Sequence, residues 1–121
     1  MNITDTFING LVARSQTVPP RVVEQAKKCL LDYLGVVIGG KKYIRNVHPK
    51  LLNTFGEAAP YRALVNGFCA HALELDDGHR HGMIHLGASI ITAVLLAAEK
   101  ERLAYDKILC GIVMGYEVAV R

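Results

Sequence analysis

Residues 21–40 read RVVEQAKKCLLDYLGVVIGG, and this stretch decides the fold class. Its apolar residues recur three or four positions apart, which is the spacing of one face of an α-helix. That face carries Val22, Val23, Ala26, Leu30, Leu31, Leu34 and Val37. Pro20 suits the first turn, because proline lacks the N–H that would remain unpaired there. Glycine commonly follows the last turn of a helix, so the sequence predicts that Gly39 and Gly40 end it.

The rest of the chain has the same helical spacing. A first helix is predicted from Thr4, as its cap, to the TVPP stretch at 17–20, and a short one over 49–56 that ends at Gly56. Further helices are predicted over 60–75, 88–101 and 104–121, where Gly111 and Gly115 permit close contact with a neighbouring helix. The fold class is therefore predicted to be all-α, one antiparallel assembly of about five or six helices over residues 1–121.

The composition limits the kinds of partner. The chain of 121 residues is 51% hydrophobic, which is more apolar surface than we expect one small domain to bury. A partner chain, or a further part of a longer chain, is expected to cover the surplus. The longest apolar stretch, at 89–98, is too short to span a bilayer, and the net charge of +3 comes without a basic stripe. Neither a membrane nor a nucleic acid is therefore expected as a partner.

The cysteines indicate the compartment. Cys29, Cys69 and Cys110 are an odd number and lie far apart, without a C-x-x-C pair. This pattern argues against a disulfide framework, a structural zinc site and an iron–sulfur cluster. The first residues, MNITDTFING, lack the basic start and apolar run of a signal peptide. The sequence therefore predicts a cytoplasmic protein.

Residues 71–89, HALELDDGHRHGMIHLGAS, hold four of the five histidines together with three carboxylates. Gly78, Gly82 and Gly87 break the helical pattern, so a loop between two apolar helices is predicted. One interpretation is a solvated loop whose polar residues shape turns and cap helices. A second is a metal site, built from His71, Glu74, Asp76, Asp77, His79 and His81. No known metal-ligand pattern such as H-E-x-x-H is present to support it.

The third interpretation is an acid–base site without a metal. An imidazole titrates near neutral pH and can move a proton to or from carbon while carboxylates orient it. The predicted helix after the loop begins beside His85. A helix N-terminus is a natural seat for a carboxylate or a phosphate. A histidine and a helix N-terminus together suit an anionic organic acid, and spacing alone leaves the three interpretations open.

The stretch ALVNGFCAHALELDDGHRHGMIHLGASIITAVLLAAE, residues 63–99, resembles the MmgE/PrpD superfamily. That superfamily includes 2-methylcitrate dehydratase, cis-aconitate decarboxylase and iminodisuccinate epimerase. Its members have an N-G, a following histidine, an acidic residue before a D-D pair, and an H-P-[GS] motif before an apolar helix. The flanks agree, because VVEQAKKCLLDYLGVVIGG resembles an early helix of the family and ILCGIVMGYEVAVR resembles its GYE-x-x-x-R helix.

The resemblance implies the N-terminal helical portion of a longer lyase or isomerase. Such enzymes act on small polycarboxylates by proton abstraction and elimination, without a cofactor, and are typically homodimers with a second, α+β domain. Dehydration is the first choice of reaction, and decarboxylation and epimerisation stay open. Further active-site residues of the family have no counterpart in this chain, so we expect it to be inactive or incomplete alone. The alternatives are a non-catalytic helical oligomerisation module, a subunit of a split enzyme, and a metal-binding helical protein.

The resemblance also implies roles for single residues. His85 matches the histidine of the H-P-[GS] motif and Glu74 the acidic residue before the D-D pair, so these two are the expected catalytic residues. Asp76 and Asp77 match the D-D pair and are expected to bind substrate. The same role is expected of His79, Arg80 and His81, because their charge could attract an anion. His71 and Asn66 are expected to give structural support from the helix before the loop, and no residue is expected to bind a metal.

Three positions depart from the family pattern. Gly78 stands where the dehydratases and decarboxylases usually have threonine, Leu86 replaces the proline of H-P-[GS], and Thr92 stands where proline is common. The missing hydroxyl at position 78 removes a possible substrate contact. The substrate is therefore left open.

Overall fold

The computed structural model describes residues 2–54 and 58–121. The helices in these ranges are α1 (Ile3–Ser15), α2 (Pro20–Val47), α3 (Pro49–Thr54), α4 (Ala59–His71), α5 (Gly87–Glu101) and α6 (Tyr105–Ala119). No strand forms among the described residues, which carry only an isolated bridge between His79 and Ile84. The predicted all-α class and the predicted number of helices are confirmed.

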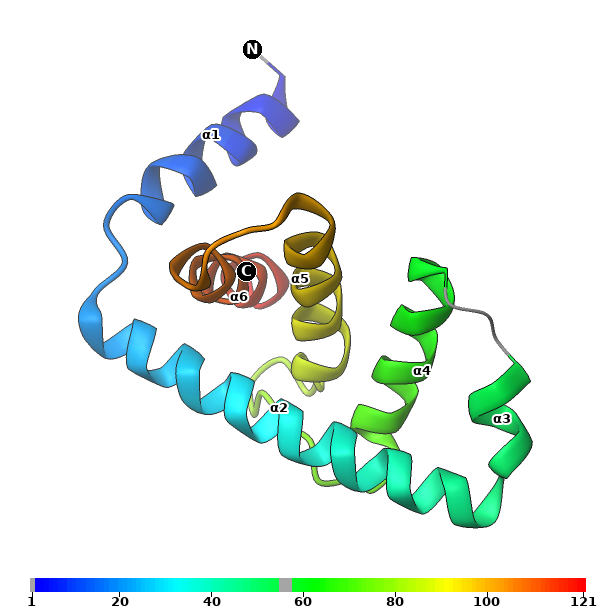
Figure 1. Cartoon of the computed structure of the whole chain (residues 1–121). Coiled ribbons are helices and arrows are strands. Elements are labelled where there is room, and N and C mark those ends of the chain that lie inside the picture. The colour runs from blue at the N-terminus through cyan, green and yellow to red at the C-terminus, as the bar shows by residue number, and fades with distance from the viewer. Residues whose placement is uncertain (1, 55–57) are drawn as a thin grey trace.

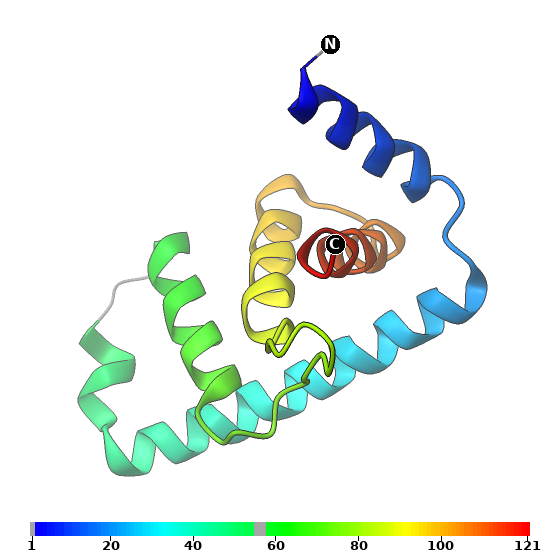
Figure 2. The ribbon, with the colours of Figure 1, turned by 180° about the vertical axis from the view of Figure 1, so that it is seen from behind.

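The long helix α2 contacts α3, α4, α5 and α6, whereas α1 contacts α6 (Figure 1). α4 and α5 lie side by side on it and run in opposite directions, as predicted (Figures 1 and 2). α6 is seen nearly end-on and packs against α5 on the side away from α4 (Figures 1 and 2). The core lies where α2, α4, α5 and α6 meet. It consists of Ala26, Leu30, Tyr33, Val36, Val37, Ala70, Ile91, Leu109 and Ile112.

The prediction that Gly39 and Gly40 end the second helix is wrong. α2 continues through both glycines to Val47. Gly40 serves helix packing instead, because a Cβ atom at this position would lie 1.9 Å from the carbonyl oxygen of Cys69 in α4. The two backbones touch at this point, and only glycine leaves room for that approach. Glycine at position 40 therefore marks the crossing of α2 and α4 rather than a helix end.

Other helix ends differ from the prediction by a few residues. The cap of α1 is Asn2, not Thr4, because the Asn2 side chain accepts a hydrogen bond from the Asp5 N–H at 2.8 Å. Pro20 opens α2 as predicted. α4 ends at His71 rather than at residue 75. The predicted end of the short helix at Gly56 lies outside the described residues.

Small residues set the contacts of α5. A Cβ atom on Gly115 would lie 2.5 Å from Ile90 Cγ2, and one on Gly111 would lie 3.1 Å from a methyl group of Val94. These distances confirm that the two glycines of α6 permit a close approach to α5. On the other side, Gly67 of α4 brings its backbone against the carbonyl of Ala88. The contacts of Gly115 with Ile90 and of Gly67 with Ala88 hold the beginning of α5 between α6 and α4.

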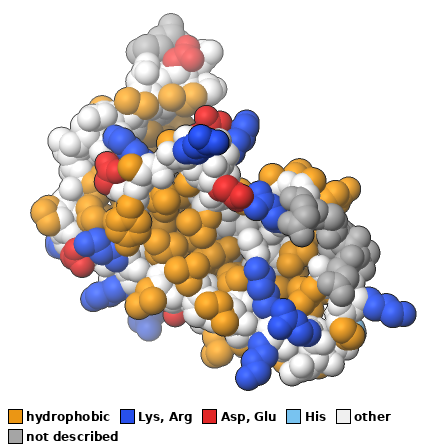
Figure 3. Space-filling view, viewed as in Figure 1, with side chains coloured by type: hydrophobic (Ala, Val, Ile, Leu, Met, Phe, Trp, Pro, Cys, Tyr) orange, Lys and Arg blue, Asp and Glu red, His pale blue; other side chains and the backbone are white. Residues whose placement is uncertain are grey.

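The surplus of apolar surface is visible. Leu31, Leu34 and Ile38 form a stripe on α2 that faces solvent, and Leu64 and Phe68 are exposed on α4. The prediction that Leu31 and Leu34 share one face with Leu30 and Val37 is therefore wrong, because the core covers only the side of α2 that carries Leu30 and Val37. Figure 3 shows hydrophobic side chains gathered near the middle of one face, with lysines and arginines around them. Within the described ranges, no helix is both long and apolar enough to cross a bilayer.

Candidate functional site

The loop between α4 and α5 carries the ionisable residues singled out in the sequence (Figure 2). Two of its residues, Glu74 and Met83, have φ angles of 52°, in the left-handed region that side chains other than glycine rarely adopt. The Glu74 N–H bonds to the carbonyl of His71, which closes the turn after α4. A left-handed backbone at a non-glycine residue persists only where its surroundings impose it. The loop is thus held in a defined shape at Glu74.

Asp77 ties the loop to two helices. Its carboxylate accepts a hydrogen bond from the Gly87 N–H, the first residue of α5, at 2.7 Å. Its other oxygen accepts a hydrogen bond from the Tyr116 hydroxyl on α6. A Cβ atom at Gly87 would lie 2.6 Å from the Asp77 carboxylate, so glycine is what lets the carboxylate reach the amide. Burial and the Asp77 carboxylate raise the pKa of Tyr116, which keeps its hydroxyl a donor.

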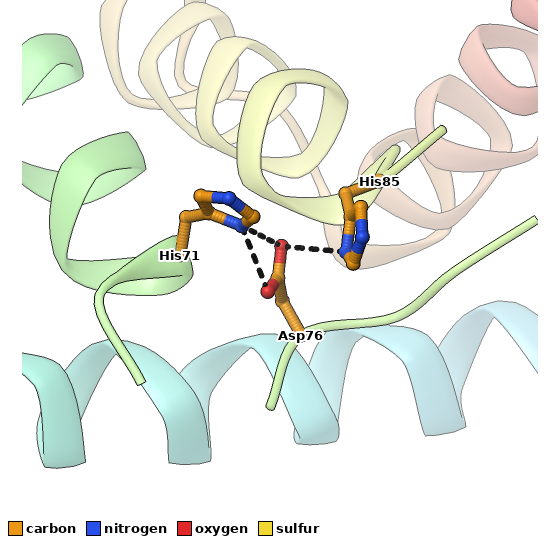
Figure 4. Close-up of side chains that lie close together, drawn as sticks. All are labelled: His71, Asp76 and His85. Carbon is orange, nitrogen blue, oxygen red and sulfur yellow. Dashed lines mark hydrogen bonds and ion pairs between the residues drawn. The ribbon is translucent and has the colours of Figure 1, made fainter. Parts of the chain in front are cut away.

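Asp76 lies between two histidines (Figure 4). Nδ1 of His71, the last residue of α4, lies 3.0 Å from both Asp76 carboxylate oxygens. Nδ1 of His85, two residues before α5, lies 3.4 Å from one of them. The Asp76 side chain is 3% exposed, whereas those of His71 and His85 are 48% and 45% exposed. A buried carboxylate thus aligns two imidazoles whose other edges reach solvent.

The hydrogen bond and the charge of Asp76 raise the pKa of His71 above its ordinary value of 6.5. The imidazolium form is favoured because it places a positive charge beside a buried negative one. His71 is therefore charged over a wider range of pH than a free histidine. The cluster can hold and release a proton near neutral pH.

A cavity of about 820 Å³ lies between α4 and α5, beside this cluster. His71, Glu74 and His85 stand at its polar side, with Ser89 in the first turn of α5. The remaining lining is mostly apolar and comes from the facing sides of the two helices: Ala63, Leu64, Gly67, Phe68, Ala72, Ala88, Thr92 and Ala93. A cavity of this size with few polar groups at one side suits a small organic ligand.

The two expected catalytic residues both line this cavity. Glu74 is mostly exposed, and its carboxylate lies 3.5 Å from Nε2 of His71. Glu74 therefore approaches the edge of the His71 ring opposite to the one that Asp76 contacts. The structure brings Glu74, His71, Asp76 and His85 into one chain of contacts. Their catalytic roles stay predictions.

The other predicted substrate-binding residues lie elsewhere. His79, Arg80 and His81 form a turn in which Nδ1 of His79 accepts the Gly82 N–H at 3.0 Å. None of the three lines the cavity. The carboxylates of Asp76 and Asp77 contact histidines, the Gly87 amide and Tyr116, so both hold the loop in shape. Asn66 lies half-buried on α4, and its supporting role stays a prediction.

Sequence reasoning missed the pairing of His71 with Asp76 and the part played by Tyr116. The sequence predicts only structural support for His71 and no site role for Tyr116. The available signal for the first pair was a histidine at the last turn of a helix with an aspartate five residues later. Tyr116 gave no local signal, because it reaches Asp77 only through the packing of α6 on α5.

The family model described as the MmgE/PrpD N-terminal domain matches residues 6–121, which is nearly the whole chain. No curated protein and no solved structure match.

Proposed function

Because this chain belongs to the MmgE/PrpD family through its N-terminal domain, we propose that it supplies the acid–base side of a lyase site for small polycarboxylates. The observation that supports the proposal is the pair of imidazoles held by one buried carboxylate at the edge of the cavity. Dehydration is the reaction proposed first, with decarboxylation and epimerisation as the alternatives. The proposed chemistry needs no metal or cofactor.

In the proposed dehydration, His85 removes the proton on the carbon next to a substrate carboxylate, and the C–H electron pair forms a C=C bond. The hydroxyl on the neighbouring carbon would then leave as water, with the proton of the His71 imidazolium. Asp76, whose carboxylate lies 3.4 Å from Nδ1 of His85, would orient the ring so that Nε2 can act as the base. His71, charged more readily than a free histidine, would face the developing negative charge on the substrate. Glu74 is the proposed partner of His71 at the cavity edge.

The first turn of α5 is the proposed seat for a substrate carboxylate. Ala88 and Ser89 belong to this turn and line the cavity. Helix N-termini favour anions because their N–H groups carry partial positive charge. The Gly87 amide is already engaged by Asp77, so the seat would use the amides that follow.

A polycarboxylate needs more positive charge than the residues that line this cavity offer. No lysine or arginine stands among the residues that line the described cavity. We therefore propose that a second copy, another chain or a further domain supplies the remaining cationic groups. This is also the reason to expect little turnover from the chain alone.

Binding and turnover can be tested separately. We expect citrate, methylcitrate or cis-aconitate to shift the imidazole NMR signals of His71 and His85 saturably, and to leave those of His79 and His81 unchanged. His85→Gln should weaken this response, and His81→Gln is its matched control. No saturable shift with any of the three acids, or equal shifts at all four histidines, would contradict the proposal. Rapid turnover by the purified chain as a monomer would contradict the proposed need for cationic groups from outside this chain.

The exposed apolar residues favour a second candidate, a non-catalytic module that oligomerises. Leu31, Leu34 and Ile38 lie on one face of α2 and remain exposed. Sedimentation analysis of the wild type and of Leu31→Glu tests it. A stable oligomer that Leu31→Glu dissociates, together with no effect of His85→Gln on acid binding, would favour the module over the enzyme.

A further inference from the structure

We infer that His71, Asp76 and His85 form a binding site for one divalent transition-metal ion of the zinc class. The inference concerns the chain by itself and does not require the proposed reaction. One ring nitrogen of each histidine and one Asp76 oxygen lie within 4.8 Å of one another, which is close enough for a single ion to reach all three. Figure 4 shows both rings turned toward the same carboxylate.

The distances are close to those of a tetrahedral site. Zinc–nitrogen and zinc–oxygen bonds of about 2.0–2.2 Å place neighbouring ligand atoms about 3.4 Å apart. The His85 nitrogen lies 3.4 Å from the Asp76 oxygen, and the His71 nitrogen lies 3.0 Å from it. The two ring nitrogens lie within 4.8 Å of each other, and the half-exposed histidines have room to rotate toward a bound ion.

The donor set selects the kind of ion. Two imidazoles and one carboxylate suit zinc and its first-row neighbours, whereas calcium and magnesium prefer sites built from oxygen. The buried Asp76 supplies a negative charge that offsets part of the charge of the ion. The three cysteines are free, and none of them belongs to this cluster.

The fourth coordination position would face the cavity. His71 and His85 both line that cavity, so a water molecule or a ligand carboxylate has access to the ion. Three protein ligands with one open position are the arrangement of accessible zinc sites rather than closed structural ones. An ion on Nδ1 of His85 would leave the proton of the neutral ring on Nε2, so that Nε2 could no longer accept the substrate proton. If the proposed reaction holds, zinc therefore inhibits it.

The test is a titration of the metal-free full chain with ZnCl₂ at pH 7.5, followed by calorimetry and by competition with a chromogenic chelator. We expect one ion per chain. His71→Gln, Asp76→Asn and His85→Gln should each weaken binding by about tenfold or more. His79→Gln and His81→Gln are matched controls, because these rings also lie near each other, 6.2 Å apart between centroids, without the buried carboxylate. The controls should change binding by less than about threefold.

Several results would overturn the inference. They are the absence of a stoichiometric site, equal loss in the two control variants, and loss of the site on alkylation of the cysteines. Circular dichroism checks the fold of each variant. Should Asp76→Asn fail to fold, the His85→Gln result decides, because this side chain is half exposed and its replacement leaves the core unchanged.

Discussion

Substitution of Gly40 by alanine is expected to be among the most damaging small changes in this chain. The added Cβ atom would lie 1.9 Å from the carbonyl oxygen of Cys69, whereas Cβ atoms essentially never approach another atom within 3.0 Å. Backbone, rather than a movable side chain, stands in the way. α2 and α4 would have to separate by roughly 1 Å at their crossing, the difference between these two distances.

The cost of that separation can be estimated. Overpacking a close-packed core costs about 1–3 kcal/mol where side chains can yield. Since the obstacle is a carbonyl group, we expect the free energy of unfolding to fall by about 3 kcal/mol. Gly35→Ala is the matched control in the same helix, because a Cβ atom there meets nothing within 4 Å. Alanine should raise the stability by about 0.5–1 kcal/mol at that position.

Urea unfolding followed by circular dichroism at about 222 nm, a wavelength sensitive to helix content, measures both variants. The expected result is a lower midpoint for Gly40→Ala and a slightly higher one for Gly35→Ala. His71 lies two residues after Cys69, so Gly40→Ala should also disturb the contact between His71 and Asp76. Equal stability of Gly40→Ala and the wild type would refute the claim that the backbones touch at this crossing.

Three further predictions concern the side-chain network. First, Asp76 raises the pKa of His71 in the folded state above 6.5. The contact between the two residues therefore stabilises the fold fully below pH 6.5, and this stabilisation is lost as the pH rises through the folded-state pKa. NMR titration of the His71 ring should show the raised pKa, and Asp76→Asn should lower it. Second, Tyr116→Phe removes the hydroxyl that donates to Asp77 and should cost about 1–2 kcal/mol in urea unfolding; an unchanged midpoint would show that this bond contributes nothing. Third, Tyr33→Phe removes a buried hydrogen bond of 2.6 Å to Thr92, whose own hydroxyl still donates to the Ala88 carbonyl. We expect the free energy of unfolding, measured in urea, to fall by about 1 kcal/mol. Tyr43→Phe, at an exposed tyrosine, is the control and should not change it.

The hydroxyl of Thr92 also gives a structural meaning to one departure from the family pattern. Threonine stands at this position where proline is common in the family. Its Oγ1 bonds to the Ala88 carbonyl at 2.7 Å and to the Tyr33 hydroxyl, which links α5 to α2. The sequence marked position 92 as unusual, and the packing of α5 on α2 shows what the residue contacts.

The helices could be predicted because their pattern is local. The spacing of Val22, Ala26, Leu30 and Val37 is that of a helix face, and Pro20 opens the helix as its fixed φ angle suggests. The loop could be predicted for the same reason, since Gly78 and Gly82 interrupt the pattern. Membership of the candidate site was partly predictable, because Glu74 and His85 both line the cavity.

The contacts between helices could not be predicted from the local sequence pattern. Gly40 resembles a helix end in the sequence, and only the crossing of α4 shows that it is a point of close approach. The pairing of Asp77 with Tyr116 joins residues 39 positions apart. Asp76 has histidines on both sides in the sequence, but the end of α4 and the beginning of α5 decide that His71 and His85 are its neighbours and that His79 and His81 are not. The sequence by itself determined the helices and the loop, because hydrogen bonding and apolar spacing act over a few residues. The tertiary structure alone decided which side chains meet, because that depends on how the helices pack.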